Sequence, residues 1–268
     1  MRPLPALLVA FVLLIAACEE PPTPQEAPER PSLETEADSL AMRAVDAIGG
    51  YEVWQQLPGI RFDFAIDRGD GRELVASHLW NRDNGDYRLE INRGDEDPIV
   101  VLFNVNTREG SAYQGGEQLG DEETGDLLEQ AYQRYINDTY WLKAPAKVFD
   151  EGVNRSAPAD SATATQDVLH LSFGDVGLTP DDRYWLYINT ETGLVDRWGF
   201  ILQGSDEDAE PRFFAWTEYV TLGTPHGEIR IAERKDAEAE GGASILTDNV
   251  SVITSFSEAD FEDPEPRL

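Results

Sequence analysis

The stretch Ile60-Arg61-Phe62-Asp63-Phe64-Ala65-Ile66-Asp67 alternates large apolar side chains with polar or small ones. Because successive side chains of a strand point to opposite faces, the alternation predicts a strand that buries Ile60, Phe62, Phe64 and Ile66 on one face. A strand with one apolar face is typical of an antiparallel sheet with one buried side. The stretch therefore predicts an antiparallel sheet, and the flanking sequence extends it in both directions.

Further strands are expected on both sides of this one. Asn84-Gly85 is a strong signal for a tight hairpin, and the next segment alternates Tyr87, Leu89 and Ile91 with polar residues. A sheet of roughly ten twisted strands tends to curl, so a concave side is expected. Besides 60–67, the predicted strands are 74–81, 87–91, 99–105, 111–113, 168–173, 184–189, 194–202, 213–222, 228–233 and 250–254.

Few helices are predicted. Residues 37–48 follow helical spacing and end at Gly49-Gly50, and a short helical turn around Trp54 follows. From Thr124 to Trp141, an apolar stripe that includes Leu128, Ala131 and Tyr135 predicts a longer helix. We expect these helices to cover the concave side of the sheet.

The N-terminus carries a targeting signal. Arg2 precedes an apolar run from Leu4 to Ile15 that is too short to span a bilayer and has the form of a secretory signal. Ile15-Ala16-Ala17-Cys18 resembles the bacterial lipobox, in which cleavage precedes a cysteine that receives lipid. The resemblance implies lipidation of Cys18, the only cysteine, and the alternative is an ordinary signal peptide with a chance cysteine.

These features divide the chain into four parts. Residues 1–17 are the expected signal peptide, and residues 18–36 are the lipidated cysteine with a Pro- and Glu-rich tether that cannot bury a core. Residues 37–256 form one domain, and 257–268 an acidic C-terminal tail.

The charge excludes some partners. The chain has a formal net charge of −31 and only three lysines, Lys143, Lys147 and Lys235. Nucleic acid is excluded as a partner because phosphate binding needs a basic surface. Acids spread along the whole chain suggest adaptation to high salt, since a Debye length of about 3 Å at 1 M salt screens their repulsion. The alternative is ordinary acidity with a preference for arginine.

The order of elements resembles that of the LolA/LolB-like proteins: a helix, Gly49-Gly50, Trp54, a meander, a central helix and a second meander. Residues 137–145 (Asn-Asp-Thr-Tyr-Trp-Leu-Lys-Ala-Pro) also look like a block found in LolA-like lipoproteins. The resemblance implies a mainly β fold with a few helices, a single large curled antiparallel sheet in the form of a half-open β-barrel covered by helices. It also implies a place in the cell envelope, on the outer membrane facing the periplasm.

No motif for catalysis or metal binding is found. His78, His170 and His226 lack neighbours at metal-ligand spacing, and neither GxSxG nor GxxxxGK[ST] occurs. Asp206, Asp208 and Glu210 read as a plain acidic loop because an EF-hand glycine and glutamate are missing. We therefore predict no catalytic residue, no metal and no cofactor.

Aromatic residues are the candidate ligand-binding residues. They lie in predicted strands or in the central helix, where they would either line a hollow for an acyl chain or fill a core. Asn137, Asp138 and Tyr140, at the end of an apolar helix, would either cap it or face the mouth of the hollow. The candidates for the hollow are Phe62, Phe64, Trp80, Tyr87, Tyr135, Trp141, Trp185, Trp198 and Trp216.

The sequence thus favours an envelope lipoprotein, held to the membrane through Cys18, that binds or shields an apolar ligand without catalysis. That ligand would be a lipid or an acylated protein. An interaction scaffold with a filled core and a carboxylate-based hydrolase are the alternatives.

Overall fold

The fold was analysed in a computed structural model that describes residues 28–174, 179–206 and 208–268. The expected signal peptide, Cys18 and the first part of the tether, residues 18–27, lie outside the described residues.

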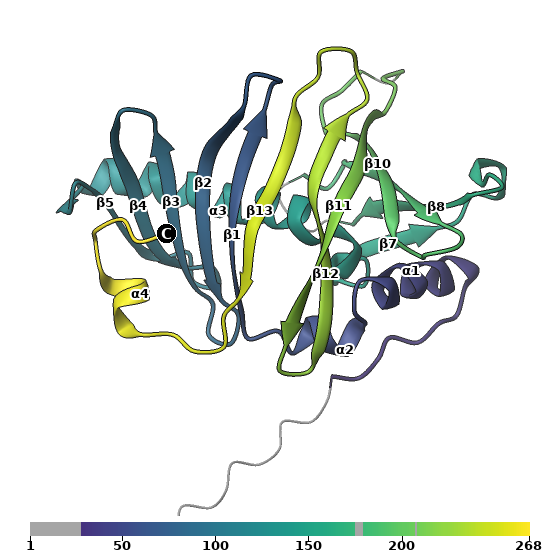
Figure 1. The fold of residues 1–268 in the computed structure, drawn as a ribbon, viewed down its shortest axis with the longest axis horizontal. Helices are drawn as coiled ribbons and strands as arrows, with labels where there is room; N and C mark the ends of the chain where they lie inside the picture. The colour runs from purple at the N-terminus through teal and green to yellow at the C-terminus, as the bar shows by residue number, and fades with distance from the viewer. Residues whose placement is uncertain (1–27, 175–178, 207) are drawn as a thin grey trace, which may run out of the picture.

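One antiparallel sheet of thirteen strands dominates the molecule (Figure 1). β1 to β6 form one meander and β7 to β13 form a second, and the last strand returns to pair with the first and so joins the two meanders. β6 and β7 are the two free edges, so the sheet does not close. The strands are β1 (Gly59–Asp67), β2 (Arg72–Asn81), β3 (Asp86–Arg93), β4 (Glu96–Asn104), β5 (Gly110–Gln114), β6 (Glu117–Gln118), β7 (Val153–Ser156), β8 (Gln166–Phe173), β9 (Arg183–Asn189), β10 (Val195–Ile201), β11 (Arg212–Thr224), β12 (Gly227–Ala237) and β13 (Ser244–Val252).

The prediction of a mainly β chain with one large antiparallel sheet and few helices is confirmed. The sequence missed the short strands β6 and β7, and it placed only the end of β13. That strand contains Asp248 and Asn249, which are poor signals for a strand. Its place in the sheet comes from pairing with β1 and β12 across long chain separations.

Four α-helices and two short 3₁₀ segments accompany the sheet in the described residues. Thr35 begins the first helix with a capping box, in which its hydroxyl accepts from the Asp38 amide and the Asp38 carboxylate accepts from the Thr35 amide. No helix in the described part of the chain is long and apolar enough to cross a membrane. The segments are α1 (Glu36–Ala47), α2 (Tyr51–Gln55), α3 (Asp121–Lys143), η1 (Ala144–Lys147), η2 (Ala159–Ser161) and α4 (Glu258–Glu262).

The long helix α3 crosses the rear face of the sheet in Figure 1. It contacts β4 and β5 of the first meander and β12 and β13 of the second. Ala131 on this helix is fully buried. Tyr135 packs against Trp80 and Tyr87, with ring centroids 5.1 and 5.3 Å apart. The predicted helix therefore exists and covers one face of the sheet.

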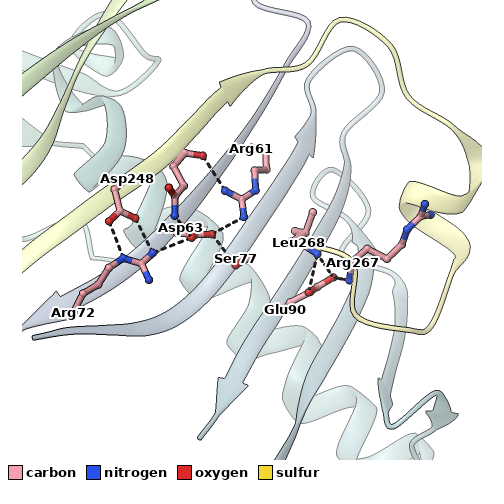
Figure 2. Close-up of polar contacts among 9 residues, drawn as sticks. Arg61, Asp63, Arg72, Ser77, Glu90, Asp248, Arg267 and Leu268 are labelled. Atoms are coloured by element: carbon pink, nitrogen blue, oxygen red, sulfur yellow. Dashed lines mark hydrogen bonds and ion pairs between the residues drawn. The ribbon is translucent and has the colours of Figure 1, made fainter.

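The opposite face carries a charged network (Figure 2). The Asp63 carboxylate accepts hydrogen bonds from Arg72 (2.8 Å), Ser77 (2.7 Å) and Asn249 (2.8 Å), and Arg61 lies 3.0 Å from it. Asp63 is only 4% exposed, although the alternation placed it on the polar face. The network links β1, β2 and β13, at the place where the two meanders meet.

The acidic C-terminal residues also lie on this face, in front of β3 and β4 in Figure 1. Arg88 is completely buried there and donates to Glu90 (2.6 Å), to the Asp263 carbonyl (2.7 Å) and to the Glu265 carbonyl. The Glu90 carboxylate accepts from the amides of Arg267 (2.7 Å) and Leu268. The segment is thus tied to the sheet, a feature that its acidic composition did not indicate.

Candidate functional site

The second half of α3 presents a continuous face to β9 and β10. Gln133, Ile136, Asn137, Tyr140 and Trp141 follow the spacing of one helical face. This spacing turns the whole group toward the sheet, and all five line the same cavity.

The strands supply the opposite wall. Tyr184 of β9 and Phe200 of β10 are direct cross-strand partners, and Trp198 lies two residues before Phe200 on the same face. The Trp198 ring packs against Trp141 (4.6 Å between centroids) and against Tyr184 (5.2 Å). Edge-to-face contacts of this kind stabilise the aromatic wall.

Between these walls lies a cavity of about 520 Å³. Its volume falls within the range of about 300–1,000 Å³ that is usual for small-molecule sites. Leu202 lines it and is 47% exposed, so the cavity opens to solvent. Its lining residues are Gln133, Ile136, Asn137, Tyr140, Trp141, Thr179, Asp182, Tyr184, Trp198, Phe200 and Leu202.

One carboxylate, that of Asp182, is buried in the wall. It accepts hydrogen bonds from the hydroxyls of Thr179 (2.8 Å) and Tyr184 (2.7 Å) and from the amide of Gln203 (2.7 Å). These donors satisfy the buried charge and fix the Tyr184 ring in the wall.

Two buried donors in the wall have no partner among the described residues, the Tyr140 hydroxyl and the Trp198 indole nitrogen. Burial raises the pKa of Tyr140, and the charges of Asp150 and Asp182 raise it further, so the hydroxyl keeps its proton. A buried donor without an acceptor is costly. A ligand with an acceptor atom would relieve that cost.

Two of the nine predicted aromatic residues, Trp141 and Trp198, line this cavity. Trp216 packs behind the wall, 5.7 Å from Trp198. Of Asn137, Asp138 and Tyr140, the first and last line the cavity, and Asp138 is buried under the helix.

A second group of the predicted residues belongs to packed core. Phe62 is fully buried and stacks on His78 at 4.3 Å, and Phe64 is 6% exposed. Tyr87 is also fully buried, whereas Trp80 and Tyr135, which pack against it under α3, line a second, smaller cavity.

The assignment of Trp185 to the hollow is wrong. Its neighbours Tyr184 and Leu186 face the interior, so the alternation of β9 turns Trp185 to the other face. There it packs against His170, with ring centroids 5.0 Å apart. The sequence does not indicate which face Trp185 lies on, because β9 carries aromatic residues on both faces.

The sequence analysis missed Tyr184, Phe200 and Asp182. Tyr184 and Phe200 lie in strands that were predicted, and their alternation with Trp198 carried the signal. Asp182 gave no signal, because nothing distinguishes it from the many surface acids until the fold buries it.

His78, Tyr87 and Asp138 form a buried polar chain beneath α3. The His78 Nδ1 atom lies 2.8 Å from the Tyr87 hydroxyl, and Nε2 lies 3.2 Å from the Asp138 carboxylate. All three side chains are at most 1% exposed, so a substrate cannot reach them. The His78–Tyr87 contact joins β2 to β3, and the Asp138 carboxylate of α3 lies beside it. Within the described residues, no cluster of His, Cys, Asp or Glu could hold a metal ion.

Comparison with known proteins gives no match by sequence and similarity to solved structures. No protein-family model and no curated protein sequence matches the chain. Among solved structures, the chain is similar to the crystal structure of a DUF1329 family protein from Desulfovibrio piger. The two share 12% sequence identity with a TM-score of 0.47, over 84% of this chain and 97% of that one.

Proposed function

We propose that this protein is a lipid-anchored protein of the cell envelope that binds an apolar, lipid-like ligand without catalysis. The observation that carries the proposal is the open cavity of about 520 Å³ with its wall of Tyr140, Trp141, Tyr184, Trp198 and Phe200. The lipobox-like Ile15-Ala16-Ala17-Cys18 supports the anchor.

The resemblance to the LolA/LolB-like proteins supports the outer membrane as the location, with the domain in the periplasm. In that setting the ligand is a lipid or the acyl group of another lipoprotein.

The polar groups of the cavity narrow the ligand class. The free donors of Tyr140 and Trp198 require an acceptor, whereas the buried Asp182 carboxylate repels an anion. A neutral carbonyl oxygen accepts from these donors and is not repelled by Asp182. A carboxylate also accepts from them, but Asp182 repels it. The ligand is therefore an acyl ester or amide, such as an acylglycerol, rather than a free fatty acid.

One observation favours a scaffold as the alternative function. In the half of the sheet from β1 to β5, Phe62, Tyr87 and Leu89 are fully buried and belong to the hydrophobic core. A protein whose remaining cavity holds no ligand would serve as an interaction scaffold of the envelope.

Binding of a fluorescent monoacylglycerol to the purified protein tests the proposal. We expect micromolar affinity, with unlabelled monoacylglycerol competing better than a fatty acid of the same length. Ile136→Trp should weaken binding at least about tenfold because it fills the cavity. Tyr140→Phe should weaken it by up to about tenfold, through the loss of one hydrogen bond.

Leu33→Trp is the matched control, because Leu33 is 48% exposed and does not line the cavity. It should leave the affinity unchanged. Absence of binding, or equal effects of Ile136→Trp and Leu33→Trp, would favour the scaffold.

A further inference from the structure

A second, smaller cavity gathers positive charge in this strongly acidic chain. It measures about 170 Å³, below the usual size of a site for a drug-sized ligand. Two of the three lysines of the chain, Lys143 and Lys147, line it together with Arg82. The remaining lining residues are Trp54, Gln55, Trp80, Tyr135, Ala146 and Asp150.

Lys143 is the most unusual of these groups. It is the last residue of α3 and only 8% exposed, and its ammonium lies 4.6 Å from the centre of the Trp80 ring. Neither a hydrogen bond nor an ion pair to this ammonium is found among the described residues. Burial lowers its pKa well below 10.5, and the charges of Arg82 and Lys147 lower it further. A buried cation without an anionic partner is costly.

Arg82 approaches the same ring from the β2–β3 turn, with its guanidinium carbon 5.2 Å from the ring centre. One of its nitrogens donates to the carbonyls of Trp54 (2.5 Å) and Leu57 (2.9 Å), which holds the group in place. Its Nε atom is buried without a partner among the described residues. Arg82 therefore lines the cavity with its guanidinium held in a fixed position.

A single acid opposes these cations. Asp150 pairs with Lys147 at 2.7 Å, so Arg82 and Lys143 face no acid of their own in the cavity. Arg82 carries a positive charge and Lys143 gains one when it binds a proton, so the cavity favours an anion.

We propose that this cavity binds one small oxyanion, a phosphate or carboxylate group, between Arg82, Lys143 and Lys147. Trp80 forms the apolar floor beneath two of the cations. The oxyanion is either a free ion or the headgroup of a lipid, and the experiment below separates the two. The proposal does not depend on the ligand of the larger cavity.

Nuclear magnetic resonance of ¹³C-labelled lysine tests this directly, because the chain has only three lysine signals. Inorganic phosphate is titrated at constant ionic strength against chloride. The Cε signal of Lys143 should move and its pKa should rise, since a bound anion stabilises the ammonium. The signal of Lys235, which does not line the cavity, should stay in place.

Two variants change the affinity for phosphate in opposite directions. Asp150→Asn should raise it about fivefold by removing the opposing charge, and Lys147→Gln should lower it about tenfold by removing a charged donor. Both side chains are partly exposed, at 41% and 22%, so the fold tolerates the changes. Arg93→Gln, an exposed cation outside the cavity, is the control and should have no effect.

Short-chain phosphatidic acid and acetate identify the source of the anion. Phosphatidic acid binds far more tightly than inorganic phosphate if a lipid headgroup is the ligand, and the two bind equally if it is a free ion. Acetate tests the carboxylate. The proposal is overturned if none of these moves the Lys143 signal, or if Arg93→Gln weakens binding as much as Lys147→Gln does. Ile136→Trp should leave phosphate binding intact, which separates this site from the larger cavity.

Discussion

Replacing Arg88 with leucine should destabilise the protein and release its C-terminal segment. Arg88 is fully buried, and it bridges Glu90 on its own strand to the carbonyls of Asp263 and Glu265. The change removes these bonds and leaves the Glu90 carboxylate, 6% exposed, without its cation.

Breaking a buried pair of this kind typically costs about 3–5 kcal/mol. Undocking of the segment would hydrate Glu90 and reduce the cost, so we expect a loss near the lower limit, about 3 kcal/mol. For a domain of this size, that corresponds to a fall in melting temperature of about 6–12 °C.

Calorimetry measures the melting temperature, and hydrogen exchange measures protection of the amides in 257–268. Among these, the amides of Arg267 and Leu268 donate to Glu90 and should lose protection. Arg93→Leu, on the exposed end of the same strand, should change stability by less than about 0.5 kcal/mol. The double variant Arg88→Leu/Glu90→Leu should regain most of the stability, because no charge stays buried, yet leave the segment exchanging.

The reasoning is refuted if Arg88→Leu has the same melting temperature as the parent protein and the amides of 257–268 stay protected from exchange. It is also refuted if the double variant is less stable than the single one.

Cys18→Ser should move the protein from the membrane to the soluble fraction of its host, and retention after a carbonate wash would contradict the anchor. The melting temperature should rise clearly between about 0.1 and about 2 M KCl, because screening weakens repulsion within a chain of net charge −31; a flat profile would rule out this adaptation. Burial lowers the pKa of Lys235 from 10.5 to about 7. Between these pH values the unfolded state holds a proton on Lys235 that the folded state has lost. The free energy of unfolding should therefore rise with pH from about 7 to about 10, and Lys235→Met should flatten that rise in urea titrations at several pH values.

The strands of both meanders could be predicted because each buries one face. In β1, β3 and β9 the alternation of apolar and polar residues shows which positions are buried. The alternation is weak in elements whose position depends on pairing with a distant segment. β13 carries turn-prone residues in its middle and is held by its pairing with β1. The acidic C-terminal residues are held by Arg88, which is 175 positions away in the chain from its partner Asp263.

The candidate site could also be predicted only in part from the sequence. Helical spacing placed Tyr140 and Trp141 on one face of α3, but the opposing wall depends on which face of β9 and β10 turns inward. Strand alternation separates the two faces without saying which is interior when both carry aromatic residues, and for this reason Trp185 was misplaced.

The order of residues determines the classes of local structure and the charge, and it carries the lipobox-like pattern, because each depends only on neighbours in the chain or on composition. Tertiary structure alone decides which of the 52 acidic residues are buried and which cations meet. Asp182 becomes a fixed part of a cavity wall, and Lys143 comes to share one indole ring with Arg82. Both depend on contacts between segments far apart in the chain, where burial strengthens electrostatic interactions that water would otherwise screen.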